Sequence, residues 1–295
     1  MSAIYVKSPF NWIGNKYQIM KQLMPLFPQK IDTLIDFFCG GCDISINATA
    51  NKKIAVDANS FLIEIMQAFQ QYSFSEILNF IEKRIDEFKL SKENEDGFLA
   101  YRDAYNNIPE YHTPLDLYTL TRFSFHFTMR FNKNLQFNAG FGRGYSNFSA
   151  RQRNSIEKFY NLIQGVELHN ASFSQIDLTS FNPNNTLLYF DPPYLITNQV
   201  YNNGLPEVWQ KWDEYDEKEL LNYLDNAHNL GFKWALSNVI EHHGKTNTIL
   251  AQWIDGYEGN LFVHDINNPA YSHCTHTVND GGNKTREIVV TNYEI

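Results

Sequence analysis

Short apolar runs alternate with amphipathic stretches along the 295-residue chain. Short apolar runs that end at turn residues predict buried strands, and apolar residues at helical spacing predict helices. The predicted strands are 33–38, 53–56, 164–168, 187–190, 233–237, 260–264 and 286–291. The predicted helices are 19–26, 43–50, 61–72, 217–229 and 246–254, with surface helices in 74–102. This alternation predicts an α/β sheet, interrupted by an insertion after the second strand.

The predicted strand 187–190 runs directly into Asp191, Pro192, Pro193 and Tyr194. We expect Asp191 at the rim of a site, because ligands of open α/β sheets bind beyond the carboxyl ends of the strands. Neither proline has an N–H, so the segment offers acceptor oxygens to a ligand with its own donors, such as an exocyclic amine. Tyr194 adds an aromatic face for stacking. The alternative is a stiff turn in which Asp191 bonds only locally.

A second polar strand end lies near the N-terminus. The predicted strand 33–38, which contains Asp36, leads through the glycine-containing turn 39–42 into a predicted helix, and such a turn lets the backbone approach a ligand closely. Asp57 ends the next strand, where an acid is placed to accept both hydroxyls of a ribose. The alternative is a helix cap, because Asp57 and Asn59 also precede an apolar helical stretch.

Composition narrows the class of protein. A hydrophobic fraction of 43% and a charged fraction of 19% indicate a folded globular chain. There is no apolar run long enough to span a bilayer and no apolar signal core at the N-terminus, so we expect a cytoplasmic protein without membrane contact. Three cysteines cannot form a disulfide framework. The spacing of Cys39 and Cys42, and the group His273, Cys274 and His276, are weak metal signals, so we expect no metal.

Charge is distributed unevenly. The net charge is −9, yet residues 117–156 contain no acid and six basic residues, interleaved with many aromatic residues. Solubility alone does not explain such segregation, which is typical of a surface that meets nucleic acid. We expect most of the phenylalanines there to form the core of the inserted segment.

Taken in order, these motifs resemble the Dam-type (D12 class) DNA adenine-N6 methyltransferases, which depend on S-adenosylmethionine. The resemblance covers nearly the whole chain and rests on residues 11–16, 36–41, 57, 122–145, 191–194 and 287–293. It implies a Rossmann-like methyltransferase sheet with an inserted, mostly helical DNA-recognition subdomain. The catalytic domain would comprise 1–61 and 160–295, and the recognition subdomain 62–159.

The resemblance also implies three sets of site residues. The catalytic set is Asp191, Pro192, Pro193 and Tyr194, in which Asp191 and the Pro192 carbonyl accept the N–H donors of the target amine. The residues that bind S-adenosylmethionine are Trp12, Lys16, Asp36, Phe38, Gly40, Asp57, Phe173 and Asp191. Of these, Lys16 would hold the methionine carboxylate, Asp57 the ribose and Phe173 the adenine. The DNA-binding set is Arg122, Arg130, Lys133, Asn138 and Arg143, with Arg130 aligned with a base-reading arginine.

Chemistry supports the same roles for the catalytic residues. The lone pair of an adenine amine is delocalised into the ring, and hydrogen bonds to Asp191 and Pro192 favour a pyramidal nitrogen aimed at a sulfonium methyl. A target inside a duplex must be flipped out and stacked, which Tyr194 can do. A cytosine-C5 enzyme needs a nucleophilic cysteine, and none of the three cysteines stands beside a proline.

The sequence departs from the family pattern at several positions. Cys42 replaces the third loop glycine, Asn15 replaces a glycine, and Ser172 replaces the acid expected before Phe173. Residues 138–140 read Asn-Ala-Gly in place of Asn-Val-Pro, so the resemblance does not extend to recognition of GATC. The expected partners are double-stranded DNA and a cognate restriction endonuclease. The alternatives are a catalytically decayed DNA-binding protein and an RNA or protein N-methyltransferase.

Overall fold

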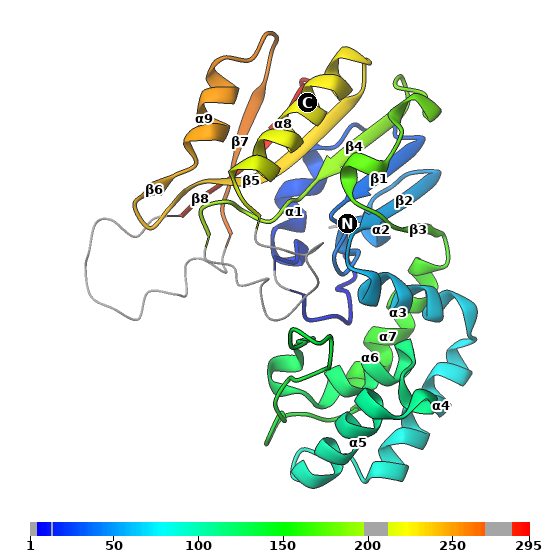
Figure 1. Ribbon diagram of the computed structural model, residues 1–295. Helices are drawn as coiled ribbons and strands as arrows, with labels where there is room; N and C mark the ends of the chain where they lie inside the picture. Colours follow the sequence, from blue (N-terminus) through cyan, green and yellow to red (C-terminus); the bar gives the residue numbers. More distant parts are fainter. Residues whose placement is uncertain (1–4, 13, 198–211, 269–284) are drawn as a thin grey trace.

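The computed structural model describes residues 5–12, 14–197, 212–268 and 285–295, and Figure 1 shows a sheet-containing part above a mostly helical part. Ile13 of the N-terminal motif lies outside the described residues, as do His273, Cys274 and His276 of the weak metal signal.

A single mixed sheet forms the centre of the upper part. Its strands follow the order β3-β2-β1-β4-β5-β8-β7, and β6 pairs with β5. The first five strands of this order are parallel, while β8 is antiparallel to both β5 and β7. The strands are β1 (Thr33–Phe37), β2 (Lys52–Asp57), β3 (Val166–Asn170), β4 (Thr186–Phe190), β5 (Lys233–His242), β6 (Lys245–Thr246), β7 (Phe262–Ile266) and β8 (Thr285–Thr291). The predicted Rossmann-like α/β sheet is confirmed.

Helices cover both faces of this sheet, which explains why its central strands are rich in apolar residues and largely buried. Side chains alternate along β1: Ile35 and Phe37 pack in a core with α8 and α9, whereas Leu34 packs in a second core with α1. The helices are α1 (Met20–Leu23), α2 (Asp43–Asn47), α3 (Ser60–Gln71), α4 (Phe74–Phe88), α5 (Glu95–Asn107), α6 (Pro114–Phe123), α7 (Ala150–Ile163), α8 (Glu214–Asn229) and α9 (Thr248–Asp255). Short 3₁₀ turns lie at Tyr17–Ile19, Met24–Leu26, Pro109–Tyr111, Phe125–Phe127, Phe173–Gln175 and Leu178–Ser180.

The bounds of several predicted elements differ from the structure by one to three residues, and two elements differ more. The predicted helix 19–26 is divided into α1 and two 3₁₀ turns, because Pro25 and Pro28 prevent a continuous helix. The predicted strand 233–237 continues to His242 as β5, because β8 supplies a partner as far as Thr285.

The helical part consists of α3 to α7 around its own aromatic core (Figure 1). As expected, most phenylalanines of the basic segment belong to that core, among them Phe123, Phe131 and Phe137. Helix α3 also packs on β2 and β3, and α7 packs on α2, so these two helices join the helical part to the sheet. Within the described ranges, no helix is both long and apolar enough to cross a membrane.

Candidate active site

The candidate site lies where β1, β2 and β4 end. These three strands are parallel neighbours in the order β2-β1-β4, with Phe37 of β1 beside Phe190 of β4. The segments that follow them therefore meet at one edge of the sheet. That edge carries residues of the glycine-containing turn, Asp57 and the segment 191–194.

The turn after β1 has an unusual backbone. Phe38, Gly40 and Cys42 all have left-handed φ angles, of 60°, 49° and 62°. A side chain at Gly40 would place its Cβ 2.6 Å from Cδ1 of Trp12, so only glycine fits there. Trp12 of the N-terminal motif and the turn, both predicted to bind the cofactor, are therefore in close contact.

Asp57 fixes this turn from the end of β2. Its carboxylate accepts hydrogen bonds from the backbone N–H groups of Gly40 and Asn59, both at 2.8 Å. The N-cap of α3 is Asn59, whose side chain accepts from the N–H of Leu62, so Asp57 is not the helix cap. Burial raises the pKa of Asp57. A carboxylate offers about four acceptor positions, so two remain for a ligand.

Asp36 acts beneath the turn. It is 1% exposed, and Oδ2 accepts from the backbone N–H of Ser45 at 3.1 Å and from the hydroxyl of Ser45 at 2.5 Å. Burial raises the pKa of Asp36 to about 7. This carboxyl group therefore ties β1 to α2 and supports the turn from inside.

An aromatic group lies beside the turn. The Phe38 ring is 5.4 Å from Phe173 and 5.5 Å from Trp212, measured between centroids. The indole N–H of Trp212 donates to the buried carboxyl group of Glu217 at 2.6 Å. Phe38 and Phe173 were predicted from the motifs, whereas Trp212 was missed because tertiary packing alone brings it to this place.

Lys16 and the segment after β4 form a buried polar cluster. The ammonium group of Lys16 lies 2.7 Å from Oδ1 of Asp191 and donates to the Tyr194 hydroxyl at 2.8 Å. The Tyr194 hydroxyl is also 3.1 Å from Oδ1 of Asp191. Asp191 therefore bonds far beyond its own turn, contrary to the local alternative. The predicted role of Lys16 at the methionine carboxylate stays a prediction.

Burial determines the chemistry of this cluster. It raises the pKa of Asp191 to about 6, although the Lys16 ammonium acts in the opposite direction. The side chain of Asp191 is 16% exposed, so a ligand can reach it. The Pro192 carbonyl accepts no hydrogen bond from the residues that the structure describes. The Asp191 carboxylate and the Pro192 carbonyl are therefore two neighbouring acceptors at the end of β4. The Tyr194 side chain is 5% exposed.

Glu287 is a fourth member of the cluster that was absent from the predicted site. It is 2% exposed on β8, and its Oε1 lies 3.1 Å from the Tyr194 hydroxyl and 3.9 Å from the Lys16 ammonium. A usable signal was present in the sequence: a lone carboxylate directly before the apolar run 288–290, where a buried strand rarely tolerates a charge.

The basic segment of the helical part carries a short hairpin between Arg130 and Asn138. Phe131 and Phe137 form an antiparallel bridge, and the N–H of Asn138 donates to the Arg130 carbonyl. The Arg130 guanidinium donates to the side-chain and backbone oxygens of Asn138 at 2.9 and 3.0 Å. Two predicted DNA-binding residues therefore act as a unit, and Lys133 is exposed near the hairpin tip.

The other two predicted DNA-binding arginines differ from each other. Arg143 is exposed and pairs with Glu95. Arg122 is 7% exposed, donates to the Pro9 carbonyl at 2.8 Å and lies 4.5 Å from the Phe127 ring. In this conformation Arg122 joins the helical part to the N-terminal segment, and its contact with DNA stays a prediction.

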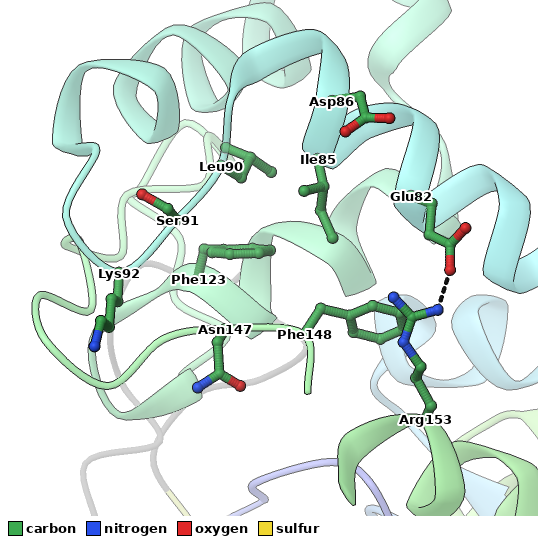
Figure 2. A pocket seen from close by; sticks show the side chains of 10 residues that line it. All are labelled: Glu82, Ile85, Asp86, Leu90, Ser91, Lys92, Phe123, Asn147, Phe148 and Arg153. Carbon is green, nitrogen blue, oxygen red and sulfur yellow. Dashed lines mark hydrogen bonds and ion pairs between the residues drawn. The ribbon is translucent and has the colours of Figure 1, made fainter. Parts of the chain in front are cut away.

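A cavity of about 570 Å³ lies away from this edge, in the helical part (Figure 2). Arg153 on its wall pairs with Glu82 and lies over the Phe148 ring.

Cys39 and Cys42 are buried free thiols, and burial raises the pKa of Cys39. Within the part of the chain that the structure describes, no group of three or more His, Cys, Asp or Glu side chains could hold a metal.

Comparison with known proteins agrees with this geometry. Residues 12–263 match the model of the D12 class N6 adenine-specific DNA methyltransferases. The chain is 40% identical to the modification methylase StsI of Streptococcus sanguinis over 98% of its own length, and 39% identical to the type II methyltransferase M.FokI of Planomicrobium okeanokoites over 98%. It is 33% identical to the modification methylase LlaI of Lactococcus lactis subsp. lactis over 97%.

The chain spans 43% of the length of each of these three relatives. Because the family model covers most of the chain and its motifs converge at one edge of the sheet, the protein belongs to the D12 class of N6 adenine-specific DNA methyltransferases.

Proposed function

We propose that this protein transfers a methyl group from S-adenosylmethionine to N6 of adenine at a specific site in double-stranded DNA, with the target base flipped out. The observation that carries the proposal is the cluster of Lys16, Asp191 and Tyr194 beside the Asp57-supported turn. An acceptor for an amine and a turn that allows close backbone approach to a nucleoside follow neighbouring strands of the sheet.

The residues around the turn fit the cofactor. Asp57 keeps acceptor positions for two ribose hydroxyls after it has bound two backbone N–H groups. Phe38, Phe173 and Trp212 provide aromatic faces for an adenine ring. When bound, S-adenosylmethionine supplies an electrophilic methyl group on sulfur. The predicted places of Trp12 and Gly40 against the cofactor belong to this proposal.

The acceptor side is built for an adenine amine. Asp191 in its ionised form and the Pro192 carbonyl accept the two N–H donors of N6, which orients the nitrogen lone pair towards the methyl group. Pro193 stiffens the segment and contributes no competing N–H. Tyr194 stacks on the flipped base once its ring, now 5% exposed, is uncovered.

Residues 62–159 act as the recognition subdomain in this proposal. The fork of Arg130, held by Asn138, suits a bidentate contact to guanine. Lys133 and Arg143 are exposed and suit phosphates. Arg122 acts from inside, by fixing the segment against Pro9. Two of the three relatives are named modification methylases, which supports a modification role for this protein beside a cognate restriction endonuclease.

Incubation of the purified protein with labelled S-adenosylmethionine and duplex DNA of varied sequence tests the proposal. Digestion of the DNA to nucleosides is expected to return the label in N6-methyladenine. An absence of N6-methyladenine on all of these DNAs would overturn it.

Parallel reactions with RNA and with protein substrates test whether the protein is an RNA or protein N-methyltransferase. Calorimetric titration with S-adenosylmethionine tests whether it is a catalytically decayed DNA-binding protein. The carboxyl group of Asp191 and the Asp57-supported turn favour DNA methylation over these alternatives.

A further inference from the structure

Glu287 reaches the catalytic edge because of the strand topology. Since β8 is antiparallel to β5, its first residues lie at the edge where the parallel strands end. Ile288 and Val290 belong to the core beneath α8, whereas Val289 belongs to the core on the opposite face. Alternation puts the Glu287 side chain on the face of Val289, which Tyr189 of β4 also shares.

The contacts of Glu287 are divided between its two oxygens. Oε2 accepts from the side-chain amide of Asn268 at 2.7 Å. Oε1 faces the Tyr194 hydroxyl at 3.1 Å and the Lys16 ammonium at 3.9 Å. The same two donors also contact Oδ1 of Asp191, at 3.1 and 2.7 Å. Asp191 and Glu287 therefore share one ammonium group and one phenol hydroxyl.

This sharing matters because Asp191 must keep acceptor capacity for an incoming amine. The Tyr194 hydroxyl has a single proton and can donate to only one of the two carboxylates at a time. A lysine ammonium that pairs fully with Asp191 also weakens that carboxylate as an acceptor. A second carboxylate nearby gives both donors another place to bond. A buried carboxylate is otherwise unfavourable within an apolar strand.

We propose that Glu287 is a positioning residue for methyl transfer: it accepts the Tyr194 hydroxyl and attracts the Lys16 ammonium while Asp191 accepts the target amine. This inference rests on the proposed function. Glu287 touches neither reacting atom in this account and acts through Tyr194, Lys16 and the ionisation of Asp191.

The negative charge of Glu287 also affects the pKa of Asp191. Burial is the main cause of the raised pKa of Asp191, Lys16 opposes it, and the negative charge of Glu287 raises it further. The other titratable groups that face this pair from the described elements are Asp36 of β1 and Tyr189 of β4. Removal of the Glu287 charge therefore lowers the pKa of Asp191.

The test compares Glu287→Gln with the wild type over a series of pH values, with methyl transfer to DNA as the readout. We expect the plateau kcat to fall by about tenfold or more, because an amide holds the Lys16 ammonium less well. We expect KM for DNA and for S-adenosylmethionine to change by less than about threefold, because Glu287 lies behind the reacting groups. The pH dependence of kcat/KM reports the pKa values of essential groups in the free enzyme. Its acid limb, which is the fall in kcat/KM at low pH, should move to lower pH.

Two further variants separate positioning from stability. Glu287→Asp keeps the charge, so its acid limb should stay nearer the wild-type position than that of Glu287→Gln. Glu217→Gln changes another fully buried glutamate, held by Trp212, Asn238 and Asn247, and should leave the acid limb unmoved even if it lowers the melting temperature. We also expect Glu287→Asp to have a lower kcat than wild type, because its shorter side chain lies farther from the Tyr194 hydroxyl and the Lys16 ammonium. If Glu287→Gln does not fold, an unchanged kcat of Glu287→Asp contradicts the role.

The outcomes are distinct. A wild-type protein without methyl transfer contradicts the proposed function. An active wild type together with a Glu287→Gln variant of unchanged kcat and unchanged acid limb contradicts the role of Glu287. A loss of activity in step with the melting temperature, without movement of the limb, assigns Glu287 a structural role and also contradicts the proposal.

Discussion

The catalytic edge of the sheet and the basic segment of the helical part hold their charges in opposite ways. At the edge, Lys16, Asp191 and Glu287 come from three distant stretches of the chain and are largely buried against one another. In the helical part, Arg130, Lys133 and Arg143 come from one continuous stretch, and their side chains are exposed. The difference fits the proposal that the edge controls protonation and geometry, whereas the exposed cations meet a large polyanion.

Removal of the central acceptor should give the largest effect. Asp191→Ala removes an oxygen that we propose accepts the target amine, so we expect methyl transfer to fall by about a thousandfold or more, as when several kcal/mol of transition-state stabilisation is lost. Calorimetry should show S-adenosylmethionine binding within about threefold of wild type, because Asp57 and the aromatic group are untouched. Retention of more than a tenth of the wild-type rate would refute the assignment.

Asp57→Ala should weaken the cofactor rather than the chemistry. Loss of a carboxylate that we propose bonds two ribose hydroxyls is expected to raise the Kd for S-adenosylmethionine about 10- to 100-fold, since hydrogen bonds to charged groups contribute about 1.5–3 kcal/mol. DNA affinity, measured by fluorescence anisotropy, should be unchanged. An unchanged Kd for S-adenosylmethionine would contradict the proposed ribose contact of Asp57.

Arg130→Ala tests the exposed region. We expect DNA binding to weaken by about tenfold and discrimination at one base pair to relax, because a bidentate contact contributes about 1–3 kcal/mol. Lys218→Ala, which removes an exposed cation of α8 that pairs with Glu214, is the control for loss of charge. Equal losses in both variants would mean that Arg130 acts only through net charge.

The smallest effect concerns stability at the edge. The folded-state pKa of Asp36 is about 7, above its ordinary value of 3.8, so this group stabilises the fold at low pH and that contribution is lost as the pH rises from about 4 through 7. Asp36→Asn cannot ionise and can still accept from Ser45. Its melting temperature should exceed that of wild type by about 2–4 °C at pH 8, and by less at pH 5.

Calorimetric scans at both pH values measure this difference. Asp32→Asn, at an exposed position, is the control and should show no such pH dependence. A gap between Asp36→Asn and wild type that is the same at pH 5 and pH 8 would show that Asp36 is not the group that titrates.

The sequence predicted the edge well because strand ends carry a local signal. Asp57 and Asp191 each terminate a short apolar run, and parallel strands bring such ends together. Trp212 was missed because only tertiary packing brings it beside Phe38. The lone carboxylate before the apolar run 288–290 marks Glu287 as unusual, but its place at this edge depends on the antiparallel pairing of β8. No pattern of period two or 3.6 encodes these contacts.

The helical part was less predictable. Its composition indicated a basic aromatic surface, and the burial of most of its phenylalanines followed from their number. The inward position of Arg122, bonded to Pro9, could not be foreseen, because an arginine in a basic segment is usually exposed. The left-handed backbone of His126 and Phe127, stabilised in part by a bond from Asn11, also arises from tertiary contacts.

Expression of the protein in a host without DNA methylation, followed by genome-wide mapping of N6-methyladenine, tests the proposed methyl transfer most directly. We expect methylated adenines at one recurrent sequence with the wild-type protein, and none with Asp191→Ala expressed at the same level. Methylation that persists with Asp191→Ala, or a wild-type protein that leaves no N6-methyladenine in the genome, would contradict it.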